Sequence, residues 1–81
     1  MPSNELLSVI NQVLANKRQP SVGALHAGMR LREDLGFVSL DLAELTVRIE
    51  EKFGVDVFAD GLVHTVGEVA QKIEKAGKLK S

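Results

Sequence analysis

Cysteine is absent from the chain, which excludes disulfide bonds and thiolate metal sites. No uninterrupted apolar run is long enough to cross a bilayer. Residues 1–5 also lack the basic start and the apolar stretch that are typical of a signal peptide. These absences predict a cytoplasmic protein that has no membrane partner.

Motifs that carry catalysis are also missing. The chain has two histidines, and it contains no Ser/His/Asp constellation, no glycine-rich phosphate loop and no HExxH metal motif. We therefore expect neither catalytic residues nor metal ligands, and we interpret the chain as a protein that is not an enzyme.

The formal net charge is −1, but the charges are unevenly distributed. Residues 33–60 hold two basic and eight acidic side chains, whereas the segments before and after them are basic. The overall balance gives no attraction to nucleic acid, and the C-terminal lysines lack interleaved aromatic side chains. A partner of the acidic segment should bring a basic surface, although a simple solvated helix face would show the same pattern.

Apolar residues recur at helical spacing in three parts of the chain, which predicts helices over about 4–16, 40–53 and 66–76. Gly54 suits the end of the second helix, and Thr65 with Glu68 forms a capping box before the last. A short helical turn is expected at 61–64, and a long connection separates the first two helices. Residues 1–81 should therefore form one all-α domain, a four-helix antiparallel bundle with a long first loop and a short third helix.

Ser39 stands where the long loop meets the second helix. Its hydroxyl fits the N-cap position, where it would accept a hydrogen bond from a backbone N–H of the first turn. The residues that follow form two apolar rows at helical spacing. The longer row should face the core and comprises Leu42, Leu45, Thr46, Ile49 and Phe53, while the shorter row comprises Leu40, Ala43 and Val47.

This stretch resembles the attachment site of the acyl carrier protein family. Ser39-Leu40-Asp41 and Glu44-Leu45 match the serine motif of the family. Residues 50–54 resemble the end of the family's second helix, and residues 65–69 resemble the start of its last one. The resemblance covers most of the chain and is strongest over 31–54. One departure is Val38, because the family usually has Asp before the serine.

The resemblance implies that Ser39 carries a 4′-phosphopantetheine arm, which a phosphopantetheinyl transferase would move from coenzyme A. The chain would then hold acyl groups as thioesters and present them to enzymes of fatty-acid, polyketide or other specialised acyl metabolism. These acyl-transferring or acyl-activating enzymes would dock through basic patches on a monomeric carrier. The residues expected to contact them are Leu40, Asp41, Ala43, Glu44, Val47 and Glu50.

Two alternatives stay open from the sequence. Val38, Arg48 and the near-neutral charge also suit a carrier of an aminoacyl or other specialised acid, loaded by an adenylating ligase. In the other alternative Ser39 is only a helix cap, and the chain is an unmodified helical interaction module. A separate hypothesis is that the aliphatic core opens a cavity for an acyl chain, as similar carriers do.

Overall fold

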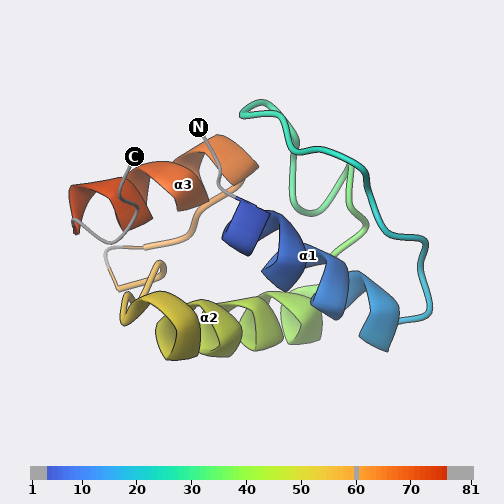
Figure 1. The fold of residues 1–81 in the computed structure, drawn as a ribbon, viewed down its shortest axis with the longest axis horizontal. Helices are drawn as coiled ribbons and strands as arrows, with labels where there is room; N and C mark the ends of the chain where they lie inside the picture. Colours follow the sequence, from blue (N-terminus) through green and yellow to red (C-terminus); the bar gives the residue numbers. More distant parts are fainter. Residues whose placement is uncertain (1–3, 60, 77–81) are drawn as a thin grey trace.

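The computed structural model describes residues 4–59 and 61–76, which form three α-helices. These are α1 (Asn4–Asn16), α2 (Ser39–Phe53) and α3 (Val66–Lys75). In Figure 1, α1 lies beside α2, and the connection between them forms a wide arc before it returns to the start of α2. The predicted bounds agree with these helices to within one residue, because apolar periodicity and end signals agree at each of them.

The predicted short helix at 61–64 is not formed. Gly61 has φ 127°, which lies outside the helical region. Val63 is buried but Leu62 is 72% exposed, so the segment has no continuous apolar face that a helical turn would bury. The described residues therefore contain three helices and no strand, which confirms an all-α fold but not the count of four helices.

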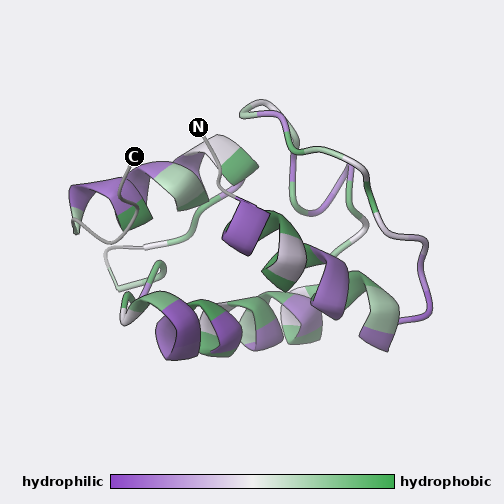
Figure 2. Ribbon diagram, viewed as in Figure 1, coloured by the Kyte–Doolittle hydropathy of each residue, from purple (hydrophilic) through white to green (hydrophobic). Residues whose placement is uncertain are grey.

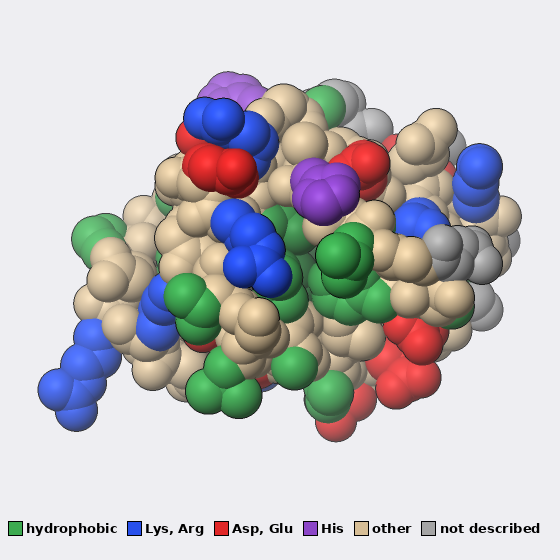
Figure 3. All heavy atoms as spheres, turned by 180° about the vertical axis from the view of Figure 1, so that it is seen from behind, with side chains coloured by type: hydrophobic (Ala, Val, Ile, Leu, Met, Phe, Trp, Pro, Cys, Tyr) green, Lys and Arg blue, Asp and Glu red, His purple; other side chains and the backbone are tan. Residues whose placement is uncertain are grey.

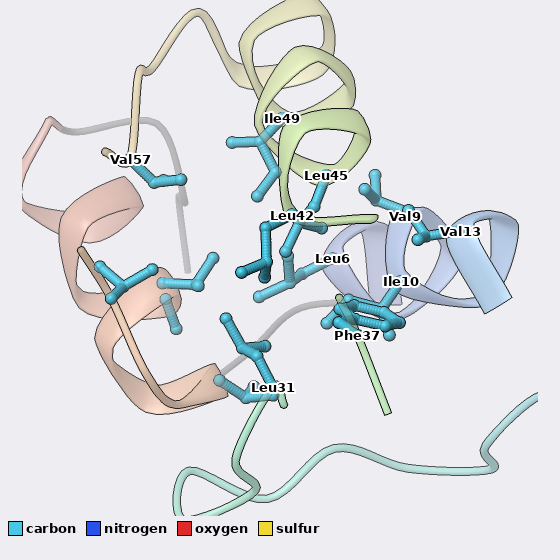
Figure 4. Packing of buried hydrophobic residues seen from close by; sticks show 14 of the residues in the cluster. Leu6, Val9, Ile10, Val13, Leu31, Phe37, Leu42, Leu45, Ile49 and Val57 are labelled. Atoms are coloured by element: carbon cyan, nitrogen blue, oxygen red, sulfur yellow. The ribbon is translucent and has the colours of Figure 1, made fainter. Parts of the chain in front are cut away.

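One aliphatic core joins the three helices. Each helix carries hydrophobic and hydrophilic residues on opposite sides (Figure 2). Figure 4 shows Leu42 and Leu45 of α2 pointing toward Leu6 of α1, and Phe37 and Leu31 reaching the same interior from the long loop. The predicted core row of α2 is confirmed, since Leu42, Leu45, Ile49 and Phe53 are buried and Thr46 is half-buried.

The long loop is held against the start of α3 by backbone hydrogen bonds. Leu31 donates to the carbonyl of His64 (2.8 Å), and Gly67 donates to the carbonyl of Ala27 (2.9 Å). A Cβ at position 67 would lie 2.8 Å from that same carbonyl oxygen, so glycine allows the close approach. The side chain of Asn11 exchanges two hydrogen bonds with the backbone of Val22 and fixes the first part of the loop to α1.

None of the helices within the described residues combines the length and the apolar character that crossing a membrane requires.

Candidate functional site

Ser39 is the first residue of α2, and its side chain is exposed. The N-cap is Val38, whose backbone is extended (φ −101°, ψ 179°) and whose carbonyl accepts from the N–H of Leu42 (3.0 Å). The prediction that Ser39 is the N-cap was therefore wrong by one position. The helix begins earlier because the carboxylate of Asp41 accepts the N–H of Val38 (2.9 Å), which stabilises the first turn without the serine.

The hydroxyl of Ser39 is consequently available. No described residue makes a hydrogen bond to it. The Val38 side chain cannot accept a bond from the first-turn N–H groups, so those donors and the positive end of the helix dipole stay open beside the serine. An anionic group attached to Ser39 Oγ would meet favourable electrostatics there.

Lys17, which follows α1, fixes the backbone on both sides of Ser39. Its ammonium pairs with the Asp41 carboxylate (2.8 Å), donates to the carbonyl of Gly36, and lies 5.9 Å from the centroid of the Phe37 ring. Asp41 and Gly36 are both remote from Lys17 along the chain, so no local sequence pattern indicates these contacts. The structure makes Lys17 part of the site.

Asp41 is the one buried charged residue among those described, and contact with a partner stays a prediction for it. Its side chain is 10% exposed and is turned toward Lys17. Burial raises the pKa of Asp41. The hydrogen bonds from Lys17 and from the Val38 N–H, together with the charge of Lys17, lower the pKa by more than burial raises it. The net effect is a pKa below the ordinary value, so Asp41 is ionised at neutral pH.

Glu44 also faces α1. Its carboxylate accepts from Arg48 Nε (2.8 Å) and from the side-chain amide of Asn16. Arg48 in turn donates to Gln12 Oε1 (2.8 Å). The Glu44 side chain is 28% exposed, so a partner could reach it, but its charge is already balanced within the chain.

The remaining predicted contact residues lie on the surface. Leu40 is 79% exposed and Val47 is 52% exposed, while Ala43 and Glu50 are exposed beside them. Val38, immediately before the serine, is 57% exposed. Seen from behind, the lower part of the molecule carries several separate groups of hydrophobic side chains, with acidic side chains at the lower right and a basic side chain at the far left (Figure 3). Contact with a partner stays a prediction for each of them.

A surface pocket of about 460 Å³ lies between α3 and the connection that follows α2. Val55, Leu62 and Val63 give it an apolar wall, and Lys72 and Glu68 add charge. No residue of α2 lines it, so it does not extend to Ser39. The hypothesis of an acyl-chain cavity in the core stays a prediction.

Comparison with known proteins places the chain in a family. The family model for the phosphopantetheine attachment site matches residues 4–73. Acyl carrier protein 3 of Ralstonia nicotianae is 33% identical over 78 residues, which cover 94% of this chain and 90% of that protein. The chain belongs to the acyl carrier protein family.

Two further acyl carrier proteins support the assignment. That of Thermotoga maritima is 33% identical over 73 residues, covering 88% of this chain and 90% of the relative. That of Saccharopolyspora erythraea is 37% identical over 73 residues, covering 88% of this chain and 77% of the relative. No solved structure matches the chain significantly.

Membership in the acyl carrier protein family defines the cofactor and the general role. The cofactor is covalently bound 4′-phosphopantetheine, since the matched family is defined by its attachment site. Acyl carrier proteins are carriers and not catalysts, so the chain is not an enzyme. Their function requires a phosphopantetheinyl transferase and enzymes that handle acyl groups.

Proposed function

We propose that Ser39 is the attachment residue, and that residues 1–81 form one carrier domain serving fatty-acid, polyketide or other specialised acyl metabolism. The observation that carries this proposal is the place of Ser39 at the open N-terminus of α2, where its hydroxyl is exposed and makes no hydrogen bond to any described residue. A nucleophile there is accessible to a large enzyme, and the helix dipole favours the phosphodiester that results.

The chain supplies the nucleophile and its position. Ser39 Oγ would attack the phosphorus next to the pantetheine of coenzyme A, forming the Oγ–P bond as the pyrophosphate P–O bond breaks. The hydroxyl proton needs a base, and the leaving phosphate needs a metal ion. No described residue makes a hydrogen bond to Ser39 Oγ, so we propose that the transferase brings both. When bound, the cofactor supplies a thiol that holds acyl groups, which this cysteine-free chain cannot do itself.

Intact mass spectrometry tests the proposal. The purified chain is incubated with a broad-specificity phosphopantetheinyl transferase, magnesium and coenzyme A. We expect a gain of one phosphopantetheine that maps to Ser39 and is absent from Ser39→Ala. A modified Ser39→Ala chain would refute the site. No modification of the wild type by any transferase tested would instead favour the unmodified interaction module.

A second candidate is a carrier of an aminoacyl or other specialised acid. It is favoured by the balanced charges near the serine, where Lys17 pairs with Asp41 and Arg48 pairs with Glu44. The modified chain would be offered separately to a malonyl-transferring enzyme and to an adenylating ligase with its acid. The mass gained on the cofactor distinguishes the two candidates.

We also propose that the carrier is monomeric and cytoplasmic. Sedimentation equilibrium of the modified chain and fractionation of the source cells test these two points.

A further inference from the structure

Every acidic side chain from position 34 to position 44 is paired with a cation. The pairs are Lys17–Asp41 (2.8 Å), Arg30–Asp34 (3.2 Å) and Arg48–Glu44 (2.8 Å). Ser39 lies within this stretch, and Val38 before it is uncharged. An anion attached to Ser39 therefore meets no unpaired acid from this part of the chain.

Asp41 is the acid of this stretch that could most strongly oppose such an anion. It follows Ser39 by two residues, and its carboxylate accepts the N–H of Val38 (2.9 Å), so the carboxylate lies beside the first turn of α2. The Asp41 side chain is 10% exposed, whereas those of Asp34 and Glu44 are 38% and 28% exposed. Because water screens a buried charge least, the neutralisation of Asp41 matters most.

The cation that neutralises Asp41 is held in place by several contacts. The Lys17 ammonium also donates to the carbonyl of Gly36 and lies 5.9 Å from the centroid of the Phe37 ring. The next residue, Arg18, has a left-handed backbone (φ 60°), which residues other than glycine rarely adopt, and the chain leaves α1 there. The Lys17 charge is therefore fixed beside Asp41.

We propose that Lys17 is a positioning residue for the cofactor, because its neutralisation of Asp41 lets the first turn of α2 accept the negative phosphodiester on Ser39. The inference rests on the proposed function and adds to the attachment site a residue that is remote in the sequence. The open N–H groups and the helix dipole attract the anion, whereas an unpaired Asp41 would repel it. Lys17 thus stabilises the modified state beyond its contribution to the fold.

Urea unfolding of unmodified and modified chains tests the inference. The quantity compared is the change in urea midpoint that modification causes in each variant, so that the effect of the substitution on the fold itself cancels. The test variants are Lys17→Met, Lys17→Arg and Lys17→Met/Asp41→Asn. Lys17→Gln, which keeps a hydrogen-bond donor without the charge, is measured in parallel in case Lys17→Met does not fold. Arg18→Gln removes a neighbouring exposed charge and is the control matched in net charge to Lys17→Met.

At low salt we expect modification to change the midpoint of Lys17→Met less favourably than that of the wild type, by at least about 0.5 M urea. Lys17→Arg keeps the positive charge and Arg18→Gln keeps the ion pair, so both should respond to modification as the wild type does. Lys17→Met/Asp41→Asn should also respond as the wild type does, because Asn can still accept the Val38 N–H but carries no charge.

Ser39→Asp provides a measurement that does not depend on the cofactor, since it places a negative charge at the same residue. Its effect on the midpoint should be less favourable in Lys17→Met than in the wild-type background. The inference is overturned if Lys17→Met and Lys17→Gln respond to either anion as the wild type does, or if Lys17→Met/Asp41→Asn keeps the loss. A wild-type chain that gains no mass refutes the attachment site, and the Ser39→Asp measurement still decides the inference.

Discussion

The ammonium of Lys17, one residue beyond the end of α1, lies 2.8 Å from the carboxylate of Asp41 in the first turn of α2. The same ammonium donates to the Gly36 carbonyl, and Asp41 accepts the N–H of Val38. One cation thus joins the end of the first helix to the residues on both sides of Ser39. This contact fixes the backbone that presents the serine.

Replacing Lys17 by Met should destabilise the fold by about 1–3 kcal/mol, because Asp41 keeps its largely buried charge and loses its partner. Urea unfolding followed by circular dichroism measures the effect. The neighbouring Arg18→Gln removes an exposed positive charge and should change stability by less than about 0.5 kcal/mol. Equal losses in the two variants would show that the ion pair contributes nothing specific.

Asp41 should make stability fall in acid. Its pKa is lower in the folded chain than its ordinary value, so the folded state binds fewer protons than the unfolded state. Its contribution is complete above about pH 4 and is lost as the pH falls through the lowered pKa. Urea midpoints measured from neutral pH down to pH about 2 should show a smaller acid loss in Asp41→Asn than in wild type. Exposed Glu51→Gln serves as the comparison, and an unchanged acid loss in Asp41→Asn would contradict the assignment.

Gly67→Ala should destabilise the contact between the long loop and α3. Alanine favours a helix over glycine by about 1 kcal/mol, but its Cβ would lie 2.8 Å from the Ala27 oxygen and 3.0 Å from the Ala27 Cβ. The backbone must then move and weaken the Gly67 hydrogen bond, at a net cost of about 1–3 kcal/mol. Thermal unfolding checks the sign, and Gln71→Ala on the exposed side of α3 should be neutral. A stabilised Gly67→Ala would mean that the loop is not held there.

Ser39→Ala and Thr65→Ala should differ in stability although both remove a hydroxyl at a helix start. Thr65 is a true N-cap, accepting from the Glu68 N–H (3.2 Å), so its loss should cost about 0.5–2 kcal/mol. Ser39 is one position inside α2 and caps nothing, so Ser39→Ala should cost less than about 0.5 kcal/mol. Urea unfolding midpoints of the two variants, both without the cofactor, measure the difference. An equal loss of stability in the two variants would show that Ser39 is a helix cap.

The three helices and the candidate serine could be predicted from the amino-acid sequence alone. Apolar periodicity and local end signals such as Gly54 and the Thr65–Glu68 capping box act within a few residues, so they can be read along the chain. The buried and exposed rows of α2 follow from the same spacing. The short helical turn predicted at 61–64 was wrong, because a segment of four residues is too short to show helical periodicity.

The ion pairs of the α2 carboxylates, by contrast, depend on how the helices pack. Asp41, Glu44 and Glu50 look equivalent in the sequence, since all three are acids on one helix. Because α1 packs beside α2, side chains at the end of α1 reach the first two of these acids. Lys17 pairs with Asp41, and Asn16 donates to Glu44. Gln12 accepts from Arg48, which itself pairs with Glu44. Such pairings depend on the distance between segments that are remote in the chain, and no local pattern encodes that distance. Packing of the two helices therefore set the charge around Ser39 and left Glu50 exposed.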